Sequence, residues 1–353
     1  MSEHSDAAFV SGLKRGSRSL RIAAVVASTG LVLAACGGGE DGGAKTTAGE
    51  GCDKSGSFPQ GSIELIVPWS AGGGTDSVAR FVGTQLGEKL DTQVNVVNRT
   101  GGSGVVGHSA IAMGNPDGST IGLVTVELTM MHHQGLTDLS YEDVTPVAQV
   151  NSDASGVVVA ADAPWDTATD LIEAAESTPG EITASGTGLG GIWHLAVAGM
   201  LLEAGVDPGA IQWVPSEGAA PALQELVAGG IDVSTASLVE NQTMIEAGKV
   251  KPIGVMAEER DPKYPDVPTL KEQGVDFQMA AWRGIAGPAG MDEDIVAELE
   301  CHLDEIVHGA EYKEFMGKAG FGIEWRNSEE FAQFMAEEDK TKGEIMEAAG
   351  LTQ

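Results

Sequence analysis

The sequence has few basic residues: 20 lysines and arginines stand against 52 aspartates and glutamates, for a formal net charge of -32 at pH 7. Such a charge repels polyanions, so we expect no nucleic-acid partner and no adhesion to an anionic membrane face. The acidity favours solubility. A high-salt habitat would account for it equally well, because salt screens the self-repulsion of an acidic surface.

Cysteine is also scarce, with three residues in the chain. Cys36 lies in the N-terminal segment, which leaves Cys52 and Cys301. In an oxidising exterior these two could pair and tie an N-terminal tether to the folded body. The alternative is an exposed thiol in a linker and a half-buried thiol on the helix expected at residues 292–306.

Signatures of catalysis are missing. There is no Gly-X-Ser-X-Gly elbow and no cysteine-enzyme signature around Cys301, so nothing marks a hydrolase nucleophile. Glycines at 186, 188 and 191, and at 102, 104 and 107, match the dinucleotide fingerprint. Because 49 residues are glycine, chance matches are expected, and a dinucleotide-binding enzyme is only an alternative. We expect no enzymatic activity and no cofactor.

A metal site is not expected either. His132 and His133 with Glu127 are the candidate ligands, but adjacent histidines on a loop lack the spacing that would turn two ligands toward one ion.

The N-terminus has the organisation of an export signal. Four basic residues between positions 14 and 21 precede an uncharged stretch, residues 22–35, that is too short to span a bilayer comfortably. The stretch ends in Leu33-Ala34-Ala35-Cys36, which resembles the bacterial lipobox, where the cysteine thiol receives a lipid. We therefore expect a signal peptide at 1–35, lipidation of Cys36, and a flexible tether at 36–57 composed largely of Gly, Ser, Thr and charged residues.

Residues 58–353 exceed what one compact core usually holds, so two lobes are expected. Short β-branched runs alternate with helical stretches, which predicts an α/β class. The chain is expected to enter the second lobe near Val158–Ala161 and to return near Phe277–Trp282, before two acidic terminal helices. Lobe 1 is thus predicted as 58–159 plus 280–353, and lobe 2 as 160–279. The expected strands are 63–67, 94–97, 121–126, 156–160, 182–185, 211–215, 231–234 and 253–256, and the expected helices are 75–90, from about 106, 168–176, 192–204 and 221–228.

Two glycine-rich turns carry the strongest functional signal. The first runs from Val67 to Asp76 and joins a strand to a helix, and the second runs from Ala184 to His194 in the same context. Bare backbone N–H groups and the positive end of a helix dipole meet at such a turn, which makes it a site for an anion such as a carboxylate. Thr75 or Asp76 could instead only cap its helix, and His194 could be a packed or capping residue.

The ordered set of motifs resembles the extracytoplasmic receptors of tripartite tricarboxylate transporters, also called Bug proteins. Besides the two turns, the resemblance rests on Asn98–Gly104, Pro116–Gly118, Val214–Leu223, Gly230–Asp232, Pro268-Thr269 and Trp282–Gly284, which fall in family order. It implies a two-lobed periplasmic-binding-protein fold, type II-like, in which each lobe is a mostly parallel sheet flanked by helices and a hinge joins the lobes.

The resemblance further implies an exported, monomeric receptor, lipid-anchored on the outer side of the cytoplasmic membrane. It would capture a small carboxylated solute and deliver it to membrane transporter subunits. The solute could be a di- or tricarboxylate, an acidic amino acid or an aromatic acid. A ligand sensor for a signalling membrane protein is the alternative, because a docking partner need only prefer the closed state.

Carried over position by position, the expected ligand contacts come from both turns and from later strand ends. Arg283 departs from the family, which usually has an uncharged residue there, as do Ser216 and Glu217, where an aromatic and a lysine are common. Arg283 could pair with a distal ligand carboxylate or only with a surface acid. The predicted contacts are Trp69, Ser70, Ala71, Gly72, Gly73, Gly74, Thr75, Asp76, Thr125, Ser185, Gly186, Thr187, Gly188, His194, Thr235, Ser237 and Arg283.

Overall fold

The computed structural model describes Cys52, Gly56 and residues 58–216 and 218–352. The predicted signal peptide, Cys36, most of the predicted tether and Glu217 lie outside the described residues. The described residues fall in one unit of the chain, Glu50–Gln353.

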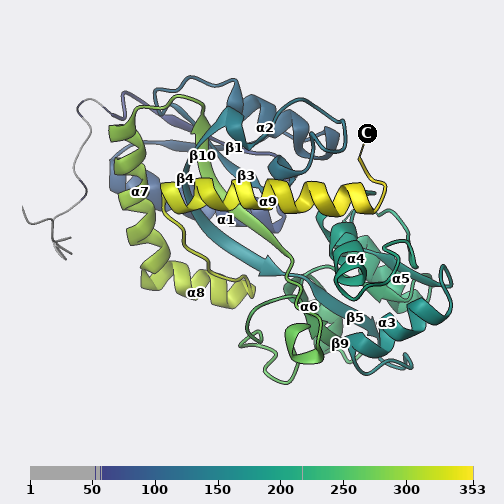
Figure 1. Ribbon diagram of the computed structural model, residues 1–353. Coiled ribbons are helices and arrows are strands. Elements are labelled where there is room, and N and C mark those ends of the chain that lie inside the picture. Colours follow the sequence, from purple (N-terminus) through teal and green to yellow (C-terminus); the bar gives the residue numbers. More distant parts are fainter. Residues whose placement is uncertain (1–51, 53–55, 57, 217, 353) are drawn as a thin grey trace, which may run out of the picture. The chain divides into compact units, whose positions relative to one another are not determined.

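Strands and helices alternate through the first two thirds of the described chain (Figure 1). The strands are β1 (Ile63–Val67), β2 (Val94–Asn98), β3 (Thr120–Thr125), β4 (Val144–Ala154), β5 (Gly156–Ala160), β6 (Ile182–Ser185), β7 (Ile211–Trp213), β8 (Val233–Ser234), β9 (Val250–Val255) and β10 (Ala280–Pro288). The α-helices are α1 (Gly74–Leu90), α2 (Val105–Ala112), α3 (Ala168–Ser177), α4 (Ile192–Glu203), α5 (Ala219–Ala228), α6 (Leu238–Glu246), α7 (Glu293–His308), α8 (Ala310–Ala319) and α9 (Ser328–Ala348). Two short 3-10 helices matter for the site, η1 (Gly102–Gly104) and η2 (Val126–Thr129).

The first sheet has the order β2-β1-β3-β10-β4. Strand β1 pairs in parallel with β2 and β3, whereas β10 runs antiparallel to β3 and β4. The apolar run of β1 is almost completely buried, as expected for a central strand with both faces covered. Its carboxyl end leads directly into the first glycine-rich turn.

The second sheet has the order β7-β6-β8-β5-β9. Strand β6 pairs in parallel with β7 and β8, and β5 is the antiparallel member of this sheet. Helix α4 follows β6 and is apolar on nearly all sides, so almost every residue from Ile192 to Leu201 is buried. The predicted two-lobed α/β fold with mostly parallel sheets is confirmed.

The chain passes between the sheets at Ser155, which separates β4 from β5. The prediction placed this crossing near Val158–Ala161 and gave most of β5 to the first lobe, whereas β5 pairs in the second sheet. The return crossing precedes β10, as expected. The two crossings lie side by side, because the Ser155 N–H donates to the Met279 carbonyl across 2.8 Å.

Three helices follow β10 in the described chain, where two were predicted. The last, α9, is the long yellow helix of Figure 1 and contacts both β4 of the first sheet and α4 of the second lobe. Its Phe331 and Phe334 pack edge-on against Trp282 of β10, with ring centroids 5.4 and 5.7 Å away. The C-terminal helix therefore joins the two lobes as well as completing the first.

A disulfide joins Cys52 to Cys301 on α7, with the two Cα atoms 5.7 Å apart. Of the two states that the sequence left open for these cysteines, the structure has the bonded one. None of the helices in the described ranges is both long enough and apolar enough to cross a bilayer.

Candidate functional site

The first glycine-rich turn connects β1 to α1 and is held from within by Asp76. Helix α1 begins at Gly74, and its N-cap, Gly73, has no side-chain cap. The Asp76 carboxylate, in the first turn of the helix, accepts from the Gly72 N–H (2.8 Å) and from Asn98 and Arg80 (both 2.9 Å). Although burial by itself raises its pKa, the hydrogen bonds from Arg80, Gly72 and Asn98 hold the pKa of Asp76 below its usual value. Asp76 thus holds the backbone of the turn in place.

Thr125, at the end of β3, is the centre of a buried polar chain. The Trp69 indole N–H donates to the Thr125 hydroxyl (3.2 Å), and that hydroxyl donates to the Glu127 carboxylate (2.6 Å). The Thr125 N–H donates to His108 Nε2 (3.1 Å), and His108 Nδ1 lies 2.9 Å from the Gly104 carbonyl. An Nδ1–H tautomer satisfies both contacts. Burial lowers the pKa of His108 to about 4, so the ring is neutral at physiological pH.

The second glycine-rich turn connects β6 to α4. Gly186 must be a glycine, since a Cβ there would lie 2.7 Å from the Cβ of Trp193. Gly190 has a left-handed φ of 73° and donates its N–H to His194 Nδ1 (3.0 Å). The His194 ring stacks on Trp213 with centroids 4.7 Å apart. Burial lowers the pKa of His194 to about 4, so it acts as a neutral acceptor that fixes the turn.

Predicted contacts at the later strand ends are also buried. Thr235 donates its hydroxyl to the Trp193 carbonyl (2.7 Å), and the Ser237 side chain forms a capping box with Glu240 at the start of α6. Ser185 is 2 % exposed, and its hydroxyl has no hydrogen-bond partner among the described residues.

A cavity of about 600 Å³ lies where the two glycine-rich turns meet. It is lined from the first lobe by the ends of β1 and β3 and by η1, and from the second lobe by the β6–α4 turn and the segment before α5. The predicted contacts that line it are Trp69, Ser70, Thr75, Thr125, Thr187, Gly188 and Arg283. The predicted contacts that do not line it are Ala71, Gly72, Gly73, Gly74, Asp76, Ser185, Gly186, His194, Thr235 and Ser237.

The amino ends of four α-helices reach this cavity. Thr75 belongs to the first turn of α1, and Gly104, Gly191 and Gly218 are the N-caps of α2, α4 and α5. Each helix start leaves backbone N–H groups without helical partners and carries the positive end of a dipole. The cavity is therefore suited to an anionic group despite the acidity of the chain.

Several lining residues were not predicted as contacts. Residues 100–104 were noticed as a motif but not assigned to the site, although they follow β2, whose carboxyl end shares an edge with that of β1. Ser216 was noted only as a departure from the family. Gly218 belongs to the motif at Val214–Leu223, and Glu127 was considered only as a metal ligand. Gln134 and Glu240 also line the cavity, and no local pattern distinguishes them.

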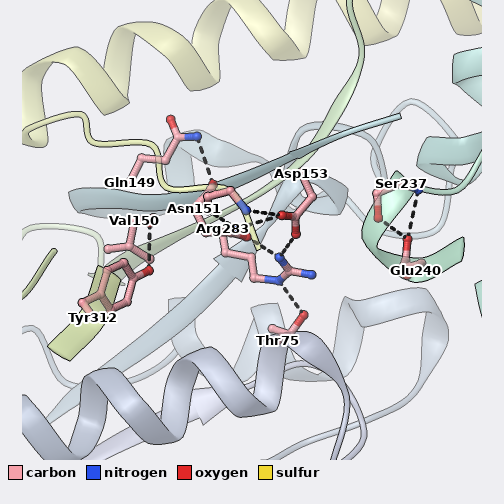
Figure 2. A network of polar contacts seen from close by, with 10 residues as sticks. Thr75, Gln149, Val150, Asn151, Asp153, Ser237, Glu240, Arg283 and Tyr312 are labelled. Carbon is pink, nitrogen blue, oxygen red and sulfur yellow. Dashed lines mark hydrogen bonds and ion pairs between the residues drawn. The ribbon is translucent and has the colours of Figure 1, made fainter. Parts of the chain in front are cut away.

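Arg283 lies on β10 of the first sheet, and Figure 2 shows its guanidinium between Asp153 and Thr75. It donates to the Asp153 carboxylate (2.6 Å), the Asn151 side chain and the Thr75 hydroxyl (3.0 Å). Its carbon Cζ also lies 5.5 Å from the centre of the Phe321 ring. Arg283 therefore lines the cavity, but its charge already has a carboxylate partner.

Two glutamates of the described chain also line the cavity. Glu127 lies on η2 in the first lobe, and Glu240 lies on α6 in the second. Burial raises the pKa of both carboxyl groups, and the nearby Arg283 charge opposes the rise. Glu240 is exposed within the cavity lining, whereas Glu127 is half-buried.

His132 and His133 lie next to the cavity wall, and their geometry differs from what was expected. His132 Nε2 lies 3.0 Å and His133 Nε2 3.6 Å from Oδ1 of Asp339 on α9. The two adjacent rings do face one acidic group, contrary to the spacing argument, because the third residue comes from a helix far away in sequence. His133 Nε2 also lies 3.1 Å from the Asp339 backbone carbonyl, so contacts between the loop and α9 account for this arrangement.

Comparisons with known proteins agree with this geometry. The model of the family described as "Tripartite tricarboxylate transporter family receptor" matches residues 78–351. A UPF0065 protein encoded in the tcbD-tcbE intergenic region of Pseudomonas sp. (strain P51) is 30% identical over 281 residues, 78% of this chain and 83% of that protein.

Among solved structures, a TctC solute-binding protein from Polaromonas has a TM-score of 0.72 at 33% identity over 82% of this chain and 99% of its own. MatC from Rhodopseudomonas palustris, solved with bound malate, has a TM-score of 0.69 at 27% identity, with 82% and 99% covered. An R. palustris protein solved with adipate has a TM-score of 0.73 at 25% identity, with 84% and 99% covered.

These relatives and structural neighbours are solute-binding proteins and not enzymes, so the chain is a solute-binding protein. Because the family model spans nearly all of both lobes and the glycine-rich turns of both lobes meet at one cavity, the chain belongs to the tripartite tricarboxylate transporter family of receptors.

Proposed function

We propose that the protein is an exported receptor that binds a small carboxylated solute between its lobes and delivers it to a tripartite tricarboxylate-type membrane transporter. The observation that carries this proposal is the meeting of four helix amino ends, those of α1, α2, α4 and α5, at one cavity. In a chain of net charge -32, long-range forces oppose an incoming anion. Short-range N–H donors in a cleft of lower effective dielectric supply the attraction instead.

The chemical class of the solute is supported by two structural neighbours. MatC holds malate and the other R. palustris protein holds adipate, and both ligands are dicarboxylates. The two proteins share the fold of this chain over more than four fifths of its length. We therefore propose that this receptor also binds a carboxylate, at the amino ends of its helices.

The proposed contacts are the predicted residues that line the cavity, together with the unpredicted residues 101–104, Ser216 and Gly218. Two predicted residues outside the lining, Asp76 and His194, would act on the ligand indirectly, because each holds the backbone of a glycine-rich turn. Asp76 fixes the N–H of Gly72, and His194 fixes that of Gly190.

Ligand-driven closure is proposed as the signal to the transporter. The crossings at Ser155 and Met279 lie side by side, so a small change of backbone angles there would rotate the second lobe against the first. The transporter would dock on the closed form, and no covalent bond is made or broken.

Membrane attachment through a lipid on Cys36 belongs to the same proposal, as does a monomeric state. The expected sign of lipidation is a mature chain that begins at Cys36, carries acyl mass and partitions with membranes. Cys36→Ser should release the chain into the soluble fraction without changing ligand affinity. An unmodified Cys36 in the wild-type protein would refute this part alone.

A cavity-filling substitution tests the location of the site. Gly188 lines the cavity, has no left-handed φ, and an added Cβ there meets no atom within 4 Å. Gly188→Phe should therefore fold normally while occupying part of the cavity. Gly317 of α8 is a matched control, because a Cβ there also meets no atom within 4 Å and the residue lies on an exposed helix surface.

The measurement is calorimetric titration of the full-length protein, unfolded and refolded to remove carried-over ligand, with mono-, di- and tricarboxylates, amino acids and aromatic acids. We expect one class of carboxylate to bind, Gly188→Phe to weaken binding by at least about tenfold, and Gly317→Phe to leave it unchanged. Binding of a sugar or nucleotide with no response to any carboxylate would overturn the proposed function.

A further inference from the structure

The charges that line the cavity are not those expected for a dicarboxylate ligand. Among the residues that the structure describes, its charged side chains are Glu127, Glu240 and Arg283. The Arg283 guanidinium lies 2.6 Å from the Asp153 carboxylate, and that ion pair is largely buried, with Arg283 13% and Asp153 4% exposed. The pair contributes little net charge, which leaves two carboxylates to set the potential inside the cavity.

Glu127 has hydrogen-bonding capacity to spare. One of its oxygens accepts from the Thr125 hydroxyl at 2.6 Å. Among the described residues, no lysine, arginine or histidine nitrogen lies within 4 Å of either oxygen. The Trp69–Thr125–Glu127 chain of hydrogen bonds holds this carboxylate in place at the cavity wall.

Glu240 is its counterpart in the second lobe. One oxygen accepts from the Ser237 hydroxyl (2.9 Å) and the Ser237 N–H (3.3 Å), which fixes the side chain over the start of α6. In the described part of the chain this carboxylate also lacks an ion-pair partner within 4 Å. Figure 2 shows Glu240 held by Ser237, apart from the Arg283–Asp153 pair.

Glu127 is half-buried and Glu240 is exposed within the cavity lining, and neither has an ion-pair partner among the described residues. Carboxylates presented in this way are free to pair with a cationic group of a ligand. The anion-binding helix ends and these glutamates lie on the same cavity, so one molecule can meet both only if it carries both signs of charge. A second carboxylate on the solute would be repelled, whereas an ammonium group would provide the missing partner.

We propose that the solute of this receptor is zwitterionic, with its carboxylate at the helix amino ends and a protonated nitrogen paired with Glu127 and Glu240. This inference rests on the proposed function and narrows it to amino-carboxylates.

The test compares solutes that differ in one terminal group. Succinate is paired with β-alanine, glutarate with γ-aminobutyrate, and adipate with δ-aminovalerate, so that each pair replaces one carboxylate by an ammonium group at similar length. The refolded full-length protein is titrated with each compound in the presence of a chelator, which removes divalent ions. We expect the amino-carboxylate of the best-fitting pair to bind at least about tenfold more tightly than its diacid.

Substitutions then test whether Glu127 and Glu240 cause the preference for amino-carboxylates. Glu127→Gln and Glu240→Gln keep an acceptor for Thr125 and Ser237 but remove the negative charge. Each should reduce the ratio of amino-carboxylate affinity to diacid affinity by about tenfold. Glu176→Gln is the control: it removes one negative charge from the exposed surface of α3 and should leave the ratio of amino-carboxylate to diacid affinity unchanged. Thermal melting in the absence of solute verifies that the variants fold.

The outcomes separate the two levels of the proposal. If diacids bind as tightly as their amino partners or more tightly, the zwitterion inference is overturned and the carboxylate receptor stands. If no carboxylate of any kind binds, the proposed function fails and the inference with it. A preference for amino-carboxylates that persists unchanged in both glutamine variants would overturn the assignment to Glu127 and Glu240.

Discussion

The Arg283 guanidinium and the Asp153 carboxylate lie 2.6 Å apart and join β10 to β4 beside the cavity. Asp153 also accepts from the Gly322 N–H (2.9 Å), so its position is fixed from the side away from Arg283. The arginine that could have attracted a distal ligand carboxylate is thus occupied by a carboxylate of the protein itself. Under the zwitterion proposal, this pair would disfavour a second carboxylate on the solute.

Removing that partner should change the ligand preference. In Asp153→Asn the guanidinium keeps a neutral acceptor but gains an uncompensated charge, so diacids such as succinate or adipate should bind about tenfold more tightly. The free energy of unfolding should fall by about 1–3 kcal/mol, because a largely buried arginine loses its ion pair. Calorimetry on wild type, this variant and the Glu176→Gln control measures the effect. Unchanged diacid affinity would show that Arg283 does not contact the solute.

The disulfide between Cys52 and Cys301 should stabilise the fold without affecting the site. It anchors the segment before β1 to α7 and closes a loop with a sequence separation of 249 residues. Loss of such a cross-link lowers the free energy of unfolding by about 2–4 kcal/mol, since the unfolded chain gains freedom. Cys301→Ser and Cys52→Ser should each show this loss in denaturant unfolding, with ligand affinity unchanged.

Reductant provides the control for this prediction. It should lower the stability of the wild type to that of the serine variants and leave the variants themselves unaffected. A double variant that is much less stable than either single one would contradict a shared bond.

The two glycine-rich turns of the site were predictable from the sequence. The turn after Ile63–Val67 and the turn after Ile182–Ser185 combine an apolar strand, a run of glycines and a helix, and this short-range pattern depends on no distant residue. The predicted lobe boundaries placed the two turns in different lobes, and the resemblance to a family implied that both contact one solute.

The rest depended on contacts between distant segments. Strand β4 was not predicted, because Pro146 and the polar residues Gln149, Asn151 and Asp153 interrupt its apolar pattern. Those polar side chains are buried by pairing with Arg326 and Arg283, which lie more than 100 residues later. Without β4, the crossing between lobes was placed too late, at the end of β5 rather than at Ser155.

Glu240 shows a second reason for missing a site residue. Within the sequence it is one acidic residue among 52 acidic residues, and its Ser237-X-X-Glu240 spacing is that of an ordinary capping box. Only the tertiary position of α6 brings this carboxylate into the lining of the cavity. The same holds for Glu127, which follows β3 directly.

His108 should make stability depend on pH. Burial lowers its pKa from 6.5 to about 4, so below pH 6.5 the unfolded chain binds a proton that the folded chain does not. The contribution of the neutral ring is complete above pH 6.5 and is lost as the pH falls through about 4. Wild type should lose about 1 kcal/mol per pH unit over this range relative to His108→Gln.

Denaturant unfolding at several pH values measures this difference. His194 is neutral for the same reason, with a pKa of about 4, so His194→Gln should flatten the profile by a similar amount and serve as an internal comparison. A parallel profile for wild type and His108→Gln would mean that His108 titrates normally in the folded state.

Proton exchange on binding should report the sign of the solute charge at Glu127 and Glu240. Burial raises the pKa of both carboxyl groups, while the fixed charge of Arg283 lowers the pKa of each and that of Asp153 raises the pKa of Glu240. As the pH falls toward these raised values, part of the empty receptor is protonated. An ammonium group stabilises the carboxylates, lowers their pKa and expels protons, whereas a second carboxylate on the solute raises their pKa and takes protons up.

Calorimetric titration in two buffers of different ionisation enthalpy gives the number of protons exchanged. For an amino-carboxylate we expect net release, together with an affinity that is full above the raised pKa values and declines as the pH falls through them. The double variant Glu127→Gln, Glu240→Gln should bind with no such exchange. Because a diacid and an amino-carboxylate predict opposite signs, proton uptake with the tightest-binding solute would contradict the zwitterion even where affinities alone were ambiguous.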